Sequence, residues 1–530
     1  MYVRTKTFAN KDGSQRTYLQ IVESVREEGK VRQKVIANLG RIEDLQDKEI
    51  DCLITSLAKF SRKRWIQAEA ANLLVQSAKE WGLELVFGHL WEKLGLARII
   101  ANLLEQTEIS SPLGEAVRAM VLNRISDPRS KRAVHEWLDE VYRPAFATLE
   151  LHHFYRALDF LAGHKENIEN ALFAETRNLF NLELDMVFWD TTSTYFEGEG
   201  PEMARYGYSK DHRPDRVQII VGVLMTREGM PVAHQVFPGN TADIETFKAA
   251  INDARRRFNL RRVIFVADRG MVSPALLDEL DRQRIEYIVG VKMRRAGAVA
   301  EVLATGGRYK VVRDNLKVKE VWHAADRYIV CYNPVEAEHD RQAREEMVQK
   351  LKAKLKAGIK PLIGNKGYRC FLKLNGAKAE IDRQALEREA RYDGKYVLRT
   401  NADLDTDAAA LAYKDLWRVE RAFRELKSTL DLRPIYHWKD RRVHGHVMVC
   451  FLALVLESAL QQSLKPAGAQ VEYQYLIRDL KKLKAVELTL DGQTYLCRTE
   501  MPGRAYEAFR ALGIRPPQHV RELAPGVAIN

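Results

Sequence analysis

The segments MVFWD, residues 186–190, and VIFVAD, residues 263–268, decide how this chain folds. Each is a short apolar run that ends in an aspartate, as in a buried strand that leads into an open site. If the two strands are parallel neighbours, Asp190 and Asp268 project from the same end of one sheet. Two carboxylates so close repel each other unless a cation lies between them, and Mg²⁺ suits such oxygen ligands. Taken singly, each aspartate is more often a helix cap or a turn residue.

The elements around these two strands follow a distinctive order. The strands VQIIVGVLM and PVAHQVF come after the first segment, and the helix DIETFKAAINDARRRF precedes the second. The helix PALLDELDRQR and the strand EYIVGVKM come next. This β-β-β-α-β-α-β order is that of the ribonuclease H-like fold, in which a later helix completes the site. We therefore expect an α/β protein with a ribonuclease H-like catalytic core, β-β-β-α-β-α-β-α.

A β-rich insertion, residues 294–395, separates the last of these strands from that later helix. The insertion contains alternating strands such as LKVKEV and YIVCYN and a charged helix, EEMVQKLKAKLKAG, which is usually a solvated face. The strand KYVLRTN follows, then a helix from about residue 406 to 430. The apolar run from Val447 to Leu456 indicates a second, buried helix that continues to about Leu464.

The helix YKDLWRVERAFRELK brings three polar residues onto one stripe. Tyr413, Glu420 and Lys427 are spaced by seven residues, so in a continuous helix they drift by only about 20° per step. A second, apolar stripe should pack on the sheet: Leu416, Val419, Phe423, Leu426 and Leu430. Glu420 then lies at the border of core and site, which suits a metal ligand. The alternative is an exposed helix in which Glu420, Arg424 and Lys427 are surface partners.

The pattern of the chain predicts six regions. The first 40 residues alternate apolar and polar positions, which indicates a small antiparallel sheet, and Asp51 to Asn178 have helical spacing, including AEAANLLVQSAKEWGLELVFGHLWEKL. The helices suit DNA binding or a plain bundle. The predicted regions are an N-terminal β subdomain (1–48), a helical DNA-binding domain (49–178), the first part of the catalytic core (179–293), the insertion (294–395), the second part of the core (396–465) and a C-terminal region (466–530).

The composition favours a soluble protein with a polyanionic partner. Lys and Arg outnumber Asp and Glu by 84 to 72, which gives a formal charge of +12 and indicates nucleic acid, although a merely basic protein fits too. No C-x-x-C pair is present, which argues against a zinc cluster. We expect no membrane span, because no apolar run reaches the roughly 20 residues that a span needs. We expect no export signal at MYVRTKTF either, and hence a cytoplasmic protein.

The segment RYGYSKDHRPD, residues 205–215, is basic and aromatic together. Such a loop suits a path along a nucleic-acid backbone, with Lys210 and Arg213 as the DNA-binding residues. A polar hairpin loop is the alternative.

Together these motifs resemble the DDE transposases of bacterial insertion sequences. The resemblance is to the large group with a β-rich insertion before the third acidic residue and a Y-x2-R-x3-E-x6-K signature. Tyr413, Glu420 and Lys427 match that signature, while DTT at Asp190 and DRG at Asp268 match the first two acidic motifs. The resemblance covers about residues 182 to 464.

The chain departs from the signature at one position. Leu416 occupies the place of the arginine, and the helical phase assigns Leu416 to the core. Arg418, two residues on, is the candidate for the missing phosphate contact. Arg418 and Arg424 are able to grip phosphate oxygens in a fork, although a structural role is the alternative. Arg269, which follows Asp268, is also expected to contact DNA.

The resemblance implies phosphoryl transfer with two Mg²⁺ ions, or Mn²⁺, per site. Asp190 would bridge the ions, Asp268 and Glu420 would each complete one coordination shell, and Tyr413 and Lys427 would hold phosphates. It also implies cleavage at terminal inverted repeats and joining of the 3′ ends to target DNA. The expected partners are double-stranded DNA and a second copy in a synaptic homodimer, with the active protein at the bacterial nucleoid. The alternatives are a ribonuclease H-like nuclease or resolvase without strand transfer, and a non-catalytic DNA-binding relative.

Overall fold

The computed structural model of the 530-residue chain describes thirteen stretches. These are residues 1–11, 13–27, 30–45, 47–58, 73–108, 111–180, 185–258, 263–294, 297–357, 370–375, 378–468, 471–490 and 493–523. The chain divides into a small unit, Met1–Leu74 with Thr489–Gly492, and a large unit of Val75–Leu488 with Gln493–Asn530. Each unit is described by itself.

The small unit contains the antiparallel sheet expected from the first 40 residues. Its strands are β1 (Tyr2–Ala9), β2 (Gln15–Glu27) and β3 (Lys30–Arg41), and β2 pairs antiparallel with both neighbours. Helix α1 (Asp47–Ala58) follows. The predicted helical residues 59–72 lie outside the described part of the chain.

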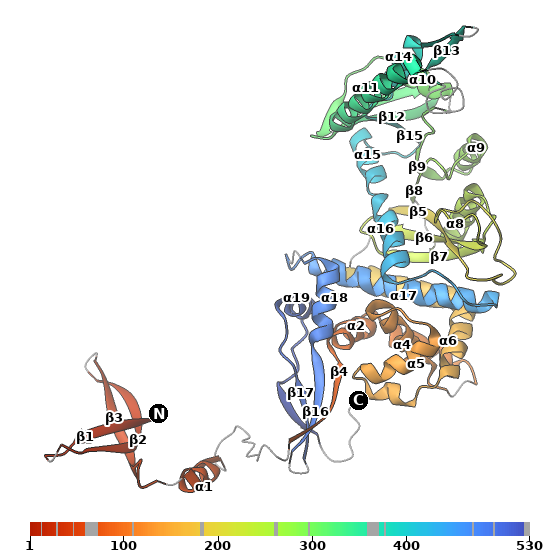
Figure 1. Ribbon diagram of the computed structural model, residues 1–530. Coiled ribbons are helices and arrows are strands. Elements are labelled where there is room, and N and C mark those ends of the chain that lie inside the picture. The colour runs from red at the N-terminus through yellow and green to blue at the C-terminus, as the bar shows by residue number, and fades with distance from the viewer. Residues whose placement is uncertain are drawn as a thin grey trace. The chain divides into compact units, whose positions relative to one another are not determined.

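A mixed sheet of nine strands is the centre of the large unit, in the order β10-β11-β12-β15-β9-β8-β5-β6-β7 (Figure 1). Strand β5 pairs antiparallel with β6 and parallel with β8, and β8 pairs parallel with β9. The strands of this half are β5 (Met186–Tyr195), β6 (Gln218–Thr226), β7 (Pro231–Pro238), β8 (Ile264–Ala267) and β9 (Glu286–Gly290). With helices α8 (Asp243–Phe258) and α9 (Pro274–Arg282), they follow the predicted β-β-β-α-β-α-β order.

Both faces of β5 are buried, which explains its continuous apolar sequence. Because side chains alternate along a strand, Met186 and Phe188 pack with the apolar side chains of α16 and α17, whereas Val187 and Trp189 pack with those of α8 and α9. In Figure 1, α15 and α16 lie on one side of the strands and α8 and α9 on the other. Asp190 shares the parity of Phe188, so it belongs to the face covered by α16.

The β-rich insertion continues the core sheet. Strand β15 (Lys395–Thr400) pairs antiparallel with β9 on one side and with β12 on the other. The other strands are β10 (Lys310–Arg313), β11 (Leu316–His323) and β12 (Asp326–Tyr332), preceded by α10 (Gly297–Ala304). Between β12 and β15 the chain makes an excursion through α11 (Pro334–Ala357), β13 (Leu372–Asn375), β14 (Lys378–Ile381) and α14 (Arg383–Ala390). The two ends of this excursion lie side by side, because the Asn333 N–H donates to the Gly394 carbonyl at 2.7 Å.

The single helix predicted for residues 406–430 is wrong, because the structure has three segments. They are α15 (Thr406–Lys414), α16 (Trp417–Arg424) and a π-helical turn, Glu425–Thr429. The backbone first tightens, since the Leu416 N–H donates to Tyr413 three residues back, and then widens, since the Leu430 N–H donates to Glu425 five residues back. The predicted apolar stripe is nevertheless buried: Leu416, Val419, Phe423, Leu426 and Leu430. The backbone therefore departs from regular α-helical geometry where this is needed to keep the stripe buried.

The helical region of the large unit lies on one side of the long helix α17 (Asp440–Leu464), and the sheet lies on the other (Figure 1). The members of the helical region are α2 (Gly82–Lys93), α3 (Leu96–Glu105), α4 (Leu113–Ser126), α5 (Lys131–Trp137), α6 (Leu151–Gly163) and α7 (Lys165–Phe180), with short 3₁₀ turns at Leu138–Glu140 and Pro144–Thr148. Helix α17 is long and apolar enough to cross a membrane, which the sequence analysis did not expect of any segment. However, 94% of its most apolar window is buried inside the molecule. It is the core helix predicted from Val447 onwards.

One element of the helical region was predicted wrongly. Residues Leu73–Glu80 form strand β4, although their sequence has helical spacing. This strand pairs in a sheet of order β18-β17-β16-β4, so its partner lies about 400 residues away, where local periodicity gives no signal. The other elements of that region are α18 (Tyr473–Lys482), β16 (Lys484–Leu490), β17 (Gln493–Arg498), α19 (Gly503–Leu512) and β18 (Val520–Leu523).

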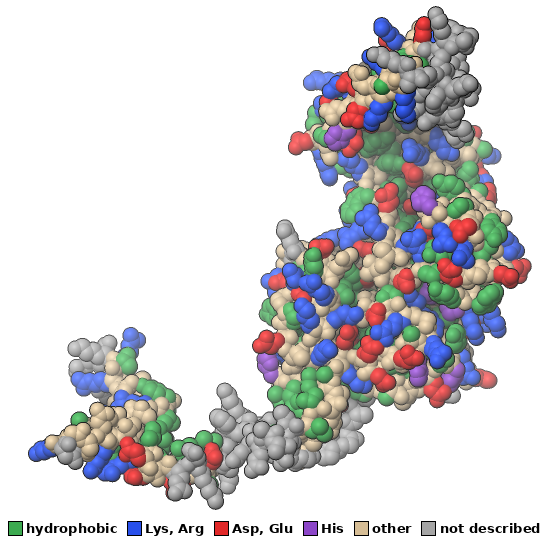
Figure 2. Space-filling view, viewed as in Figure 1, with side chains coloured by type: hydrophobic (Ala, Val, Ile, Leu, Met, Phe, Trp, Pro, Cys, Tyr) green, Lys and Arg blue, Asp and Glu red, His purple; other side chains and the backbone are tan. Residues whose placement is uncertain are grey.

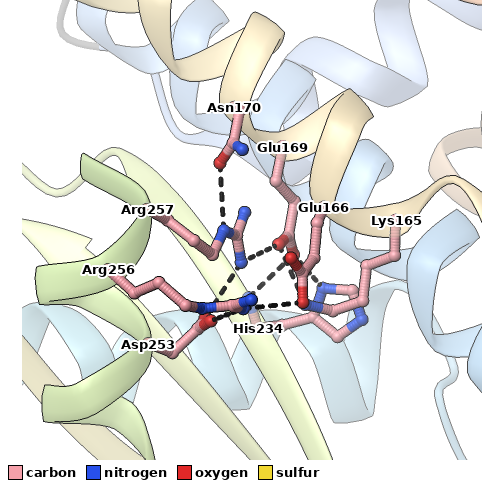
Figure 3. A network of polar contacts seen from close by, with 8 residues as sticks. All are labelled: Lys165, Glu166, Glu169, Asn170, His234, Asp253, Arg256 and Arg257. Carbon is pink, nitrogen blue, oxygen red and sulfur yellow. Dashed lines mark hydrogen bonds and ion pairs between the residues drawn. The ribbon is translucent and has the colours of Figure 1, made fainter. Parts of the chain in front are cut away.

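A buried ion cluster joins the helical region to the sheet (Figure 3). Glu169 on α7 lies 2.9 Å from Lys165, 2.8 Å from Arg257 on α8 and 2.7 Å from the His234 imidazole on β7. The His234 ring also lies 4.9 Å from the Phe451 ring of α17. Removing one partner of such a cluster leaves uncompensated buried charge, so it fixes α7 against the sheet.

Candidate active site

Asp190 and Asp268 occupy equivalent places on neighbouring parallel strands. The register pairs Phe188 of β5 with Val266 of β8, and each aspartate follows two residues later. Adjacent strands lie about 4.8 Å apart, so the two carboxylates come close together. β8 ends directly before Asp268, but β5 continues past Asp190 to Tyr195, so the prediction that Asp190 ends its strand is wrong. Phe188 and Val266 belong to the apolar core that includes α16, and the aspartates share their parity. The predicted pairing of the strands is therefore confirmed.

The surroundings of Asp190 show the repulsion expected between close carboxylates. Burial raises the pKa of Asp190 to about 6, and the charges of Asp268 and Asp243 act in the same direction. Two groups oppose them: the nearby Lys210 ammonium and the Thr191 N–H, which donates to the Asp190 carboxylate at 2.7 Å. The site thus concentrates negative charge where few water molecules solvate it.

Asp243, the first residue of α8, is an acidic neighbour that we did not predict. The Thr191 hydroxyl donates to its carboxylate at 3.0 Å, and the Lys210 ammonium lies 3.6 Å away. Lys210 also donates to the Thr191 carbonyl and hydroxyl, both at 2.8 Å. A cavity of about 240 Å³ opens beside Lys210 and Asp243. The sequence carries no signal for this contact, because an aspartate at a helix start is ordinarily only a favourable charge at the helix dipole.

Tyr413 on α15 reaches Asp268 from the face that carries Glu420. Its hydroxyl donates to the Asp268 carboxylate at 2.9 Å. Burial raises the pKa of Tyr413 well above its usual value, and the negative charge of Asp268 raises it further. Gly290 makes the approach possible, because a Cβ there would lie 2.4 Å from the tyrosine hydroxyl oxygen. Tyr413 therefore acts as a donor to a site aspartate in this structure.

Glu420 is exposed on α16 and is not gathered with the two aspartates. Among the described residues, no group of three His, Cys, Asp or Glu side chains is placed to hold a metal ion. Glu420 does lie close enough to Tyr413 for its charge to affect that residue's pKa. Glu420 therefore lies near Tyr413, the residue that donates to Asp268. Its role as third acidic ligand remains a prediction.

Lys427 forms a buried ion pair within the protein. Its ammonium lies 2.5 Å from the Asp211 carboxylate, and the Arg433 guanidinium contacts the same carboxylate. Burial lowers the pKa of Lys427, against the opposing effect of Asp211. Asp211 is one residue from Lys210, so this pair links the π-helical turn to the loop 205–215. Asp211 was not among the predicted site residues.

The four predicted arginines fall into two groups. Arg418 contacts Asp415 and the Glu228 carbonyl, and Arg213 forms a two-pronged pair with Asp215, so both are engaged in the protein. Arg269 and Arg424 are exposed. In the described residues neither of these two forms an ion pair.

The paired carboxylates of β5 and β8 fit a divalent cation. Carboxylate oxygens of Asp190 and Asp268 are the hard ligands that Mg²⁺ and Mn²⁺ prefer. Burial is the main cause of the raised pKa of Asp190, and repulsion from the Asp268 carboxylate adds to it. A cation between the two carboxylates would relieve that repulsion. The fit concerns these two residues, with Glu420 outside bonding reach in this conformation.

Comparisons with known proteins identify the family. Residues 3–70 match the model of the IS1634 family transposase N-terminal domain, and residues 183–456, just over half of the chain, match the transposase DDE domain. No curated protein matches the chain.

Two solved structures are distantly similar. One is the cryo-EM structure of a piggyBac transposase synaptic complex with hairpin DNA, at 11% identity and TM-score 0.36, covering 76% of this chain and 78% of that one. The other is a Mos1 transposase paired-end complex with the left transposon end, at 13% identity and TM-score 0.14, covering 37% and 63%. Such remote likeness carries no argument about fold, so the assignment rests on the matched domains and on the paired aspartates. The chain belongs to the DDE transposases of insertion sequences.

Proposed function

We propose that this transposase cleaves DNA at the terminal inverted repeats of its element and joins the 3′ ends to a target. The observation that supports this most is the equivalent placement of Asp190 and Asp268 on neighbouring parallel strands, facing the segment that carries Tyr413 and Glu420. Two divalent ions at that place would supply charge stabilisation at the attacking and leaving oxygens.

We assign each site residue a role in binding these ions. Asp190 would contribute to both ion sites, Asp268 and Glu420 to one each. Tyr413 keeps the Asp268 carboxylate oriented through its hydroxyl. For Glu420 to complete the site, α16 has to shift relative to β5, and the irregular backbone on both sides of α16 provides two places for that adjustment.

The positive side chains near the site are candidates for phosphate contacts. Arg269 and Arg424 are exposed and not ion-paired within the described residues, so DNA binding costs them no internal contact. Lys210, Lys427, Arg213 and Arg418 are engaged with the protein and would have to exchange those partners for phosphate. The predicted DNA-binding domain, residues 49–178, remains a proposal, and so does a dimer on paired ends.

The test is Mg²⁺-dependent cleavage of a duplex that carries the repeats bracketing the reading frame. Asp190→Asn, Asp268→Asn and Glu420→Gln should each lower the rate by on the order of 10³-fold, since each loses several kcal/mol of stabilisation. Binding to the same duplex in EDTA should be unchanged. Glu346→Gln, a change at an exposed glutamate of α11, is the matched control.

Two outcomes would overturn parts of the proposal. Parental cleavage by any one of the three variants would remove that residue from the site. Cleavage by the parent protein without joined products on a labelled end fragment would make the protein a nuclease without strand transfer.

A further inference from the structure

We propose that one face of the N-terminal sheet binds duplex DNA, a surface distinct from the aspartate site. The proposal rests on the function proposed above, in that the duplex is the element's own end. Five cationic side chains belong to this face, which is called the basic face below: Arg4, Lys6, Arg16, Arg26 and Arg41.

The register of the strands places these residues together. Lys6 of β1 is opposite Tyr18 of β2, and Tyr18 is opposite Arg41 of β3, so the three form one row across the sheet. The next row pairs Phe8 with Arg16. Directly paired residues project to the same side, and so do residues two apart along a strand, which puts Arg4 and Arg26 on the same face.

Aromatic rings lie between these cations. The rings of Phe8 and Tyr18 meet edge to face at 5.8 Å, with the Lys6 ammonium 5.2 Å from the Phe8 ring. The Arg41 Nε donates to the Tyr18 hydroxyl at 3.3 Å. Further along, Arg4 donates to Gln33, which in turn donates to the Tyr2 hydroxyl. The long side chains are thus held side by side and partly ordered before any ligand arrives, which lowers the entropic cost of binding.

The opposite face of the same sheet has a different charge. Its described residues include Glu23 opposite Lys34, with Arg32 two residues away on β3. On the basic face, by contrast, the described strand residues include no acidic side chain. Positive charge is therefore greater on the basic face, where no acidic strand residue offsets it, as suits a polyanion; Figure 2 shows Lys and Arg side chains on this sheet.

The width of the sheet suits binding in the major groove of DNA. Three strands span two inter-strand spacings, about 10 Å, and the major groove of B-DNA is about 12 Å wide. Arginine recognises guanine and glutamine recognises adenine through paired hydrogen bonds, so Arg4 and Gln33 of the basic face would exchange their mutual hydrogen bond for base edges. Lys6 and Arg16 are exposed and would lie against phosphates.

An apolar partner fits this face less well than DNA. Tyr2 and Phe8 are 44% and 45% exposed, so some apolar surface is available. Every row that contains one of these rings also carries or adjoins a cation, however, and burying unpaired cations against an apolar surface is costly. A phosphate backbone satisfies both the charges and the rings.

The test compares two double variants of the full-length protein that each remove two positive charges from the same sheet. Lys6→Gln/Arg16→Gln alters the basic face, and Arg32→Gln/Lys34→Gln alters the opposite face. Binding to the inverted-repeat duplex and to a shuffled duplex is measured in EDTA over a series of salt concentrations. The basic-face variant should lower the slope of log K against log salt by about 2 units, and the control by less than about half a unit.

The outcomes separate this inference from the proposed function. If the parent protein cleaves the duplex with Mg²⁺ but both double variants bind alike, the inference is wrong and the proposed function stands. If the basic-face variant changes the sedimentation of the free protein and leaves DNA binding intact, the face binds a second copy, which also overturns it. Retained cleavage by the basic-face variant at saturating DNA, with weakened binding, supports both.

Discussion

His234 and Glu169 show how single buried side chains make the stability of this protein depend on pH. Burial lowers the pKa of His234 to about 4, although Glu169 opposes the shift. Burial would raise the pKa of Glu169, but Lys165, His234 and Arg257 together hold it at about 2. Both groups therefore bind protons less readily in the folded protein than in the unfolded chain, whose values are about 6.5 and 4.3.

The expected consequence is a loss of stability in acid. The His234 contribution is complete above about pH 6.5 and declines towards pH 4, and the Glu169 contribution is complete above about pH 4.3 and declines towards pH 2. In His234→Gln, the fall of the thermal unfolding midpoint between pH 6.5 and pH 4 should be shallower than in the parent. His152→Gln, at an exposed histidine of α6, is the control. Identical pH profiles for parent and His234→Gln would contradict this reading of the cluster.

At the level of single residues, the sequence predicted some of the site and missed the rest for a physical reason. Asp190 and Asp268 each follow an apolar run, and their strands pair in parallel, so their meeting followed from sheet geometry even though β5 continues past Asp190. Asp243 and Asp211 come from a helix start and a loop, and their contacts depend on how distant segments pack. Such contacts leave no periodic pattern in the sequence.

Among the elements, the segment from α15 to the π-helical turn decides where Glu420 lies. Arg124 on α4 holds the C-terminal end of this segment in place. Its guanidinium donates to the Asp431 carbonyl at 3.1 Å and to the Leu430 carbonyl at 3.4 Å. Arg124 is almost fully buried. The turn after Glu420 is therefore held by the helical region.

Loss of this contact should misplace Glu420 without affecting the aspartates. We expect Arg124→Gln to lower the cleavage rate by roughly 10- to 100-fold at unchanged DNA affinity, because small errors in position are costly for a reacting group. Arg132→Gln, at an exposed arginine on α5, should have no effect. The measurement is single-turnover cleavage beside equilibrium binding, with thermal unfolding to confirm that the variant is folded. A variant that cleaves at the parental rate would show that the contact does not position the helix.

The sequence predicted the existence of this helical segment but not its irregularity. The seven-residue spacing of Tyr413, Glu420 and Lys427 assumed a uniform rotation for each residue. The packing of Leu416 and Leu430 into the core imposes a tight turn before Glu420 and a wide one after it. Propensity cannot predict such a change, since it results from tertiary contacts.

At the scale of the whole molecule, the continuity of the sheet makes part of the insertion removable. Tyr332 of β12 pairs with Lys395 of β15, and only Asn333 and Gly394 lie between these residues and the excursion. Excision of residues 334–393 would join Asn333 directly to Gly394. Asn-Gly is the preferred pair for a two-residue hairpin, and Gly394 already has a φ of +60°.

We therefore expect the excised protein to fold. Its unfolding midpoint should differ from that of the parent by no more than about 5 °C. Excision of residues 334–394, one residue more, removes the glycine and should disrupt the pairing of β12 with β15, because a shift by one residue reverses every side chain. Circular dichroism during heating measures both. Equal behaviour of the two excisions would contradict the register described above.

The unbroken sheet also governs how the enzyme can deform. Backbone hydrogen bonds connect β10, at one edge, through β15 and β9 to β8 and β5, the strands that lead to Asp268 and Asp190. Rows of such bonds resist shear as a unit, so tension applied at the far edge passes through the aspartate-bearing strands before it reaches any loop. Any elastic strain that arises in the insertion is thus transmitted to the strands that carry Asp190 and Asp268.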